Sequence, residues 1–265
     1  MIEQEWLECA DPTPMLEFLR GKASERKLRL FACACCRRIW RLLSDEGSHK
    51  AVEAVEADAD RKVLDTDPFR LALKAVADTT VELADAAGTI IVTRPGVARN
   101  TRGAQQAVLG CSLIDSWEAA FHAADRVRAV KGNIALETVP ENLLEERRAY
   151  YNGKADAPVN LEQIEAIYES GTATEGRYQS DLVRDIFGNP FRPLTVNSAW
   201  LMPTVVSLAT AIYDDRAFDR LPILADALED AGCTNADILN HCRQPGDHVR
   251  GCWVLTMILD KPALP

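Results

Sequence analysis

The chain has 265 residues, 47% of them apolar and 6% aromatic, and its formal net charge at pH 7 is −10. An acidic chain repels nucleic acid and anionic membranes unless its basic residues are gathered in one place, so nucleic acid is an unexpected partner. No apolar run reaches the roughly 18 residues of a membrane span. The acidic N-terminus lacks the basic and apolar regions of a signal peptide. We therefore expect a cytoplasmic protein without a membrane partner.

Helical spacing of apolar residues dominates the first half of the chain. Ser24 is suited to cap a helix that continues to about Leu43, and further helices are predicted over residues 50–64, 67–87 and 104–130. Glycines and prolines interrupt the pattern between 132 and 177, which predicts a loose connector there. Helical spacing returns from residue 178 onwards, where Asn235 is suited to cap a short helix to Cys242 and the last helix is predicted over residues 249–259.

We accordingly predict an all-α fold, a multi-helix globular bundle with N- and C-terminal helical halves and a looser middle segment. Residues 1–265 are taken as one domain. It can be subdivided into N-terminal helices (1–131), a connector (132–177) and C-terminal helices (178–265).

The C-terminal part concentrates possible metal ligands. Two of the four histidines and three of the eight cysteines lie within twenty positions: Cys233, His241, Cys242, His248 and Cys252. Thiolates and imidazoles are the ligands that zinc prefers. The spacing matches no standard zinc finger, and irregular Cys/His groupings are more often structural. Two alternatives stay open: a zinc site, or residues of helix ends and a buried helix face.

Two further groups of residues have side chains suited to chemistry. Cys33, Cys35 and Cys36 fall in one predicted helix, where buried cysteine more often serves as a small apolar residue than as a ligand. One face of a predicted helix carries Asp115, Glu118, His122 and Asp125. This set suits acid–base chemistry, but it is also typical of the solvent-exposed face of an amphipathic helix. The common phosphate-loop, nucleophile-elbow and dinucleotide motifs are absent from the sequence, so no enzyme class is predicted.

A basic segment stands out in this acidic chain. Between Arg20 and Leu43 there are eight basic residues and one acidic residue. The favoured interpretation is that they pair with acidic neighbouring helices. The alternative is a site for an anion or an acidic partner, made by Arg37, Arg38 and Arg41.

Three segments resemble an uncharacterised family of bacterial proteins with many paralogues. They are residues 29–40 (RLFACACCRRIW), 184–193 (RDIFGNPFRP) and 241–253 (HCR, four residues, then HVRGCW). The resemblance carries no known function. It implies only that the basic helix, the turn after residue 188 and the C-terminal Cys/His group belong to one unit.

Two functions are therefore carried forward. The first is a cytosolic protein-interaction or regulatory module without catalysis, with Arg37, Arg38 and Arg41 contacting a protein partner of unknown identity. The alternative is a zinc-binding metalloprotein, extending to a metal-dependent hydrolase, that uses the C-terminal Cys/His group. The first function needs no cofactor, so none is expected, and zinc is the cofactor of the alternative. The sequence predicts no oligomeric state.

Overall fold

The computed structural model describes residues 1–43, 46–60, 95–111 and 115–259. The predicted helix over residues 67–87 therefore lies outside the described part. Within that part the regular structure is helical, without strands, which confirms the all-α prediction. The α-helices are α1 (Glu3–Glu8), α2 (Pro12–Leu19), α3 (Glu25–Arg37), α4 (Glu46–Ala59), α6 (Pro95–Cys111), α7 (Ser116–Ala135), α8 (Glu141–Tyr151), α9 (Leu161–Phe187), α10 (Pro203–Asp215), α11 (Leu221–Asp230), α12 (Ala236–Arg243) and α13 (Trp253–Ile258). Short 3-10 turns cover Trp40–Leu42, Leu136–Thr138, Ser198–Trp200 and Phe218–Arg220.

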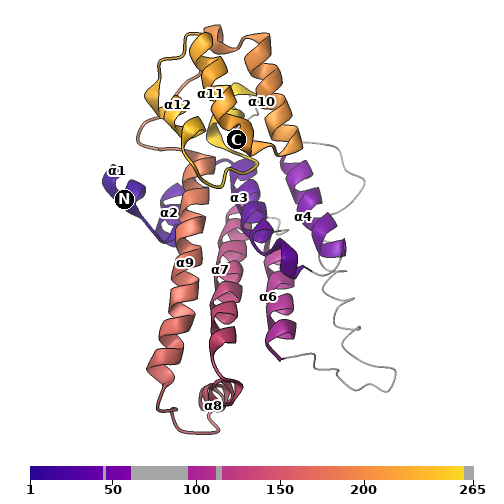
Figure 1. Ribbon diagram of the computed structural model, residues 1–265, viewed down its shortest axis with the longest axis vertical. Helices are drawn as coiled ribbons and strands as arrows, with labels where there is room; N and C mark the ends of the chain where they lie inside the picture. Colours follow the sequence, from indigo (N-terminus) through magenta and orange to yellow (C-terminus); the bar gives the residue numbers. More distant parts are fainter. Residues whose placement is uncertain (44–45, 61–94, 112–114, 260–265) are drawn as a thin grey trace.

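The N-terminal helices form an elongated bundle. The long helices α6, α7 and α9 run side by side, with α7 in the middle, and α3 packs against α7 (Figure 1). Alanines on α7 face this core, and Ala119, Ala120 and Ala123 are fully buried. Small side chains let neighbouring helices approach closely, which explains a large core built with few aromatic residues.

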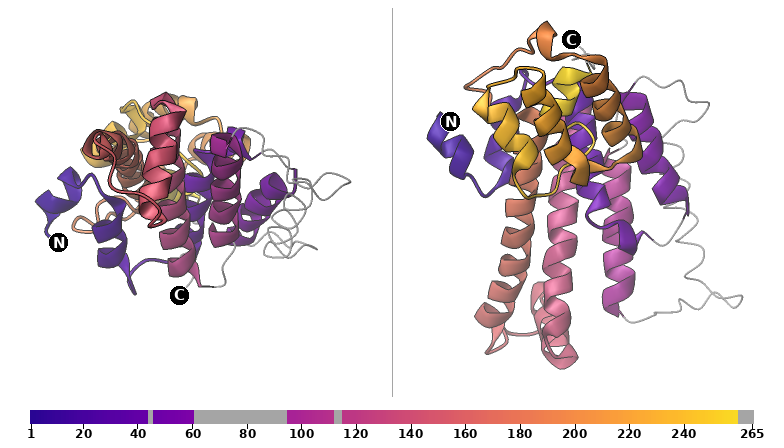
Figure 2. Two further views of the ribbon diagram at one scale, coloured as in Figure 1. Left: turned by 90° about the horizontal axis from the view of Figure 1, so that it is seen from below. Right: turned by 45° about the horizontal axis from the view of Figure 1, so that its top comes forward.

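Helices α10 to α13 form a second unit with its own hydrophobic core. Tyr213, Leu221 and Leu224 are among its fully buried side chains. This unit lies over the end of the bundle where α9 finishes (Figures 1 and 2). The last turn of α9 consequently faces α12 and α13. Among the described residues, no helix is both long and apolar enough to span a membrane.

Residues 132–177 differ from the prediction of a loose connector. They hold the end of α7, all of α8 and most of α9, which is a continuous helix of 27 residues. Gly153 lies in the turn after α8, but Gly132 and Gly171 lie within helices because α7 and α9 cross there. A Cβ atom added to Gly171 would lie 2.8 Å from the Cβ of Ala135 and 2.8 Å from the carbonyl oxygen of Lys131. Glycine here permits close helix packing rather than ending a helix.

Helix caps set the positions of the elements that matter for function. The side chains of Ser24 and Asn235 accept hydrogen bonds from backbone N–H groups at the starts of α3 and α12, as the sequence predicts. Helix α9 ends at Gly188, whose φ of +69° suits glycine. Helix α13 begins at Trp253, later than the predicted residue 249, and Cys252 is its N-cap.

Candidate metal centre

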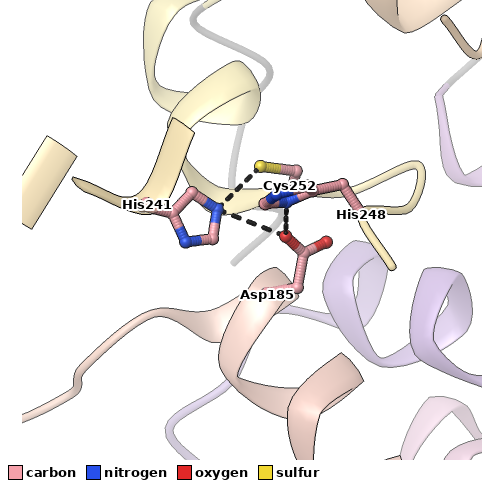
Figure 3. A group of neighbouring side chains, drawn as sticks. All are labelled: Asp185, His241, His248 and Cys252. Atoms are coloured by element: carbon pink, nitrogen blue, oxygen red, sulfur yellow. Dashed lines mark hydrogen bonds and ion pairs between the residues drawn. The ribbon is translucent and has the colours of Figure 1, made fainter. Parts of the chain in front are cut away.

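Four buried side chains meet where α9 faces the C-terminal unit (Figure 3). They are Asp185, His241, His248 and Cys252, and each contributes one potential ligand atom to a group in which all such atoms lie within 4.8 Å of one another. Asp185, His241 and Cys252 are 5%, 8% and 0% exposed. The group can hold a metal ion.

Asp185 lies in the last turn of α9, where two effects oppose a negative charge. It is buried, and the C-terminal end of a helix carries a partial negative charge of its own. Its Oδ1 lies 2.6 Å from His248 Nδ1 and 3.2 Å from His241 Nε2, and its Oδ2 accepts a hydrogen bond of 3.0 Å from the backbone N–H of Val249. Although burial acts in the opposite direction, the bonds to both imidazoles lower the pKa of Asp185 below its usual value. The carboxylate is therefore ionised and attracts cations.

The two imidazoles come from different elements. His241 is in the last turn of α12, and His248 is in the loop that precedes α13. Their rings lie edge to face, with an interplanar angle of 80° and centroids 4.9 Å apart. Burial disfavours the charged form of His248, but the hydrogen bond and charge of Asp185 raise its pKa above the usual value. The Nδ1 atom of His241 lies 3.5 Å from the side-chain amide of Gln244, which leaves its Nε2 facing the group.

Cys252 completes the group at the start of α13. Gly251, with a φ of +101°, turns the chain into this position, and a Cβ there would lie 3.1 Å from Leu30 Cδ1. The Sγ atom of Cys252 lies 3.2 Å from His241 Nε2. Burial first, and the charge of Asp185 second, raise the pKa of the thiol well above its usual value. The thiol is therefore protonated in the absence of a cation, whereas coordination to a metal ion deprotonates a thiol outright.

The geometry does not suit a Cys–His–Asp catalytic triad. In a triad the carboxylate and the nucleophile bind opposite nitrogens of one imidazole. Here Asp185 Oδ1 and Cys252 Sγ both approach His241 Nε2. The thiol is also inaccessible, and its raised pKa disfavours the thiolate that attacks substrates. Donor atoms that converge on one point fit a shared cation better.

The comparisons with known proteins name no relative. No protein-family model matches this chain, and neither a curated protein nor a solved structure matches it. The site therefore rests on its own chemistry.

The structure brings together three of the five residues that the sequence singled out as metal ligands. His241, His248 and Cys252 are in the group, whereas Cys233 and Cys242 lie outside it, buried in the core of the C-terminal unit. Burial raises the pKa of Cys242 to about 12, with a smaller contribution from the neighbouring Cys233. Sequence reasoning missed Asp185 as a ligand. Only the family resemblance, which includes the segment 184–193, connects Asp185 with the C-terminal group in the sequence.

The other sequence candidates do not form a site among the described residues. Cys33, Cys35 and Cys36 are fully buried in the core of the bundle. Asp115 caps α7 through a hydrogen bond to the backbone N–H of Glu118, so it is not on the helix face assumed for it. Glu118 and His122 form an exposed pair with 3.2 Å between Oε2 and Nε2.

Two of the three arginines proposed for partner binding are engaged within the chain. Arg37 makes a two-point ion pair with Glu56, with contacts of 2.6 and 2.7 Å. Arg38 pairs with the buried Glu175 at 2.6 Å and with Asp247 at 3.2 Å. Arg41 is exposed. These pairs agree with the favoured interpretation of the basic segment, and partner binding stays a prediction.

Proposed function

We propose that this protein is a metalloprotein that holds one zinc ion between its bundle and its C-terminal unit. The supporting observation is the convergence of four ligand atoms from α9, α12, the following loop and the start of α13. Side chains separated by up to 67 positions, from Asp185 to Cys252, meet within 4.8 Å. Both imidazoles and the backbone N–H of Val249 already contact the buried Asp185 carboxylate, and a divalent cation would supply the full counter-charge.

The distances are close to those of a loaded site. Zinc bonds of about 2.0–2.3 Å in a tetrahedron place neighbouring donor atoms roughly 3.3–3.8 Å apart. The contacts of Asp185 Oδ1 with His248 and His241 are 2.6 and 3.2 Å, and His241 Nε2 is 3.2 Å from Cys252 Sγ. Small outward movements of these side chains make room for the ion.

The donor set favours zinc over other common metals. Two imidazoles, a thiolate and a carboxylate combine nitrogen, sulfur and oxygen ligands, which suit a borderline-soft ion in tetrahedral coordination. Magnesium and calcium prefer oxygen ligands alone. The charges also balance, because the two negative charges of Asp185 and Cys252 neutralise a divalent ion.

A structural role fits better than hydrolysis. Catalytic zinc sites keep a position open for water, whereas structural sites use four protein ligands. All four positions of this group are filled by protein side chains, three of which belong to buried residues. We therefore propose that the ion joins the C-terminal unit to α9.

Metal content per chain tests the proposal directly. Protein purified without a metal-affinity tag is analysed for its elements, and about one zinc per chain is expected. Cys252→Ala and Cys242→Ala form a matched pair, since each removes a fully buried thiol from the same core. Cys252→Ala is expected to lose the metal and Cys242→Ala to retain it.

Cobalt substitution supplies a second measurement on the same pair. A tetrahedral cobalt ion with a thiolate ligand absorbs strongly in the visible range and shows a sulfur-to-metal band. These bands are expected in the wild type and in Cys242→Ala but not in Cys252→Ala. Absence of metal from the wild type, together with failure to take up zinc or cobalt, would refute the proposal.

A further inference from the structure

A cavity of about 900 Å³ lies beside the four-residue group. Its walls come from α1, α3, the end of α9, the turn after it, α12 and α13, and His241 is part of the wall. A volume of this size suits a small organic molecule. The cavity therefore adjoins the proposed metal centre without being part of it.

Basic side chains outnumber acidic ones in the cavity wall, although the chain is acidic overall. Among the described residues, four basic and one acidic side chain line the cavity. Most of these basic side chains already have partners. Arg26 pairs with the buried Asp60 at 2.8 Å, and Arg184 donates to the carbonyl oxygens of Trp6 and Cys9 and to Asp181.

Lys27 differs from these arginines. It is half-buried, and among the described residues it makes no ion pair; its recorded contact is with the ring of Phe187, whose centroid lies 5.8 Å from Nζ. Burial and the neighbouring Arg26 lower the pKa of Lys27 to about 8, although Cys252 and Asp185 act in the opposite direction. An ammonium group held out of water without a close counter-ion is poised to accept an anion.

Aromatic side chains line the same cavity. Phe187 and Trp253 are half-buried, so part of each ring is available for contact. Ring faces of this kind stack on flat apolar groups. The cavity thus offers a cation on one side and apolar surface on the other.

We propose that this cavity binds a small organic anion, a carboxylate or a phosphate ester with an aromatic body. The anionic group binds at Lys27, and the body packs against Phe187 and Trp253. Anion binding at Lys27 requires no metal ion.

Calorimetric titration at pH 7 with phenyl phosphate, benzoate and neutral benzyl alcohol tests the proposal. At least one of the two anions is expected to bind the wild type one-to-one and more tightly than benzyl alcohol. Lys27→Met is expected to weaken that binding by about tenfold or more, because a hydrogen bond to a charged group is lost. Lys27→Gln serves as a second uncharged variant. Lys154→Met removes an exposed lysine from the loop before α9 and is expected to change nothing.

Three results would overturn the proposal: neither anion binds, benzyl alcohol binds as tightly as the anions, or folded Lys27→Met and Lys27→Gln bind like the wild type. Circular dichroism establishes that each variant is folded. Anion binding to a protein that takes up no zinc upholds the cavity and refutes the metal centre, so the two proposals fail separately.

Discussion

At the scale of single residues, Lys27 is the clearest case of a side chain whose environment opposes its charge. Burial and Arg26 lower its pKa from 10.5 to about 8. A group whose pKa is lowered in the folded state binds its proton more weakly there than in the unfolded chain, so its charge destabilises the fold. A residue that weakens the fold while facing a cavity is typical of a functional position.

We therefore predict that Lys27→Met stabilises the metal-free protein at pH 7, by up to about 3 kcal/mol for a shift of this size. The penalty is complete below pH 8. Between pH 8 and 10.5 the folded state has lost the Lys27 proton that the unfolded state keeps, so the destabilisation declines over this range. Above pH 10.5 it vanishes. Urea unfolding in the presence of chelator, at pH 7 and pH 10, measures the free energy of unfolding of both proteins. The difference in free energy between the variant and the wild type is expected to be smaller at pH 10.

Lys50→Met is the control for this experiment. Lys50 is exposed and pairs with Glu46 on α4. Loss of such a surface pair changes stability by at most about 0.5 kcal/mol at either pH. If the Lys27→Met variant is clearly less stable than the wild type at pH 7, the attraction of Lys27 to Asp185 outweighs the cost of burying its charge. Lys27 would then not be an unsatisfied cation.

At the scale of elements, the crossing of α7 and α9 depends on glycine. Gly132 and Gly171 face each other there, and a Cβ on Gly171 would lie 3.1 Å from the Cα of Gly132. The closest atoms to that Cβ include the backbone oxygen of Lys131, which cannot move aside as a side chain can. The two helices must separate to admit even one methyl group.

Gly171→Ala is accordingly predicted to destabilise the protein by about 2 kcal/mol, because overpacking outweighs the roughly 1 kcal/mol by which alanine favours a helix. Ser170→Ala is its neighbour on the exposed face of α9 and is expected to be neutral or slightly stabilising. Chemical unfolding of both variants checks the difference. Equal stabilities would show that the helices move apart at little cost.

The same crossing explains what sequence patterns can predict of this fold. Apolar spacing and caps such as Ser24 and Asn235 predict the class of the fold and the starts of α3 and α12, because these signals are local. The sequence pattern wrongly indicates breaks at Gly132 and Gly171, because a glycine required by a neighbouring helix looks the same in sequence as one that ends a helix. Asp185 was missed as a ligand for a similar reason: its partners lie more than fifty positions away, and nothing nearby in the sequence indicates them.

At the scale of the whole molecule, ionic contacts join the bundle to the C-terminal unit. Arg26 on α3 contacts Asp60 at 2.8 Å and the hydroxyl of Tyr213 on α10 at 2.7 Å. Glu56 on α4 binds Arg37 of the bundle and Arg216 just after α10. The four-residue group is a further junction, between α9 and the segment from α12 to α13. A metal ion at this junction would hold the C-terminal unit against the bundle, in addition to these polar pairs and the apolar contacts.

Removal of zinc is predicted to loosen α12 and α13 more than the long helices. A ligand that binds only the folded state stabilises it by about 4 kcal/mol when its free concentration is 1,000 times Kd. Three of the four proposed ligands lie in or beside α12 and α13, so local opening of this segment breaks the site. Amide hydrogen exchange with and without chelator is expected to quicken most in residues 236–258 and least in α7. In the Cys252→Ala variant, chelator should not change the exchange rates. An equal increase of the exchange rate in all helices of the wild type would contradict the prediction that zinc stabilises α12 and α13 locally.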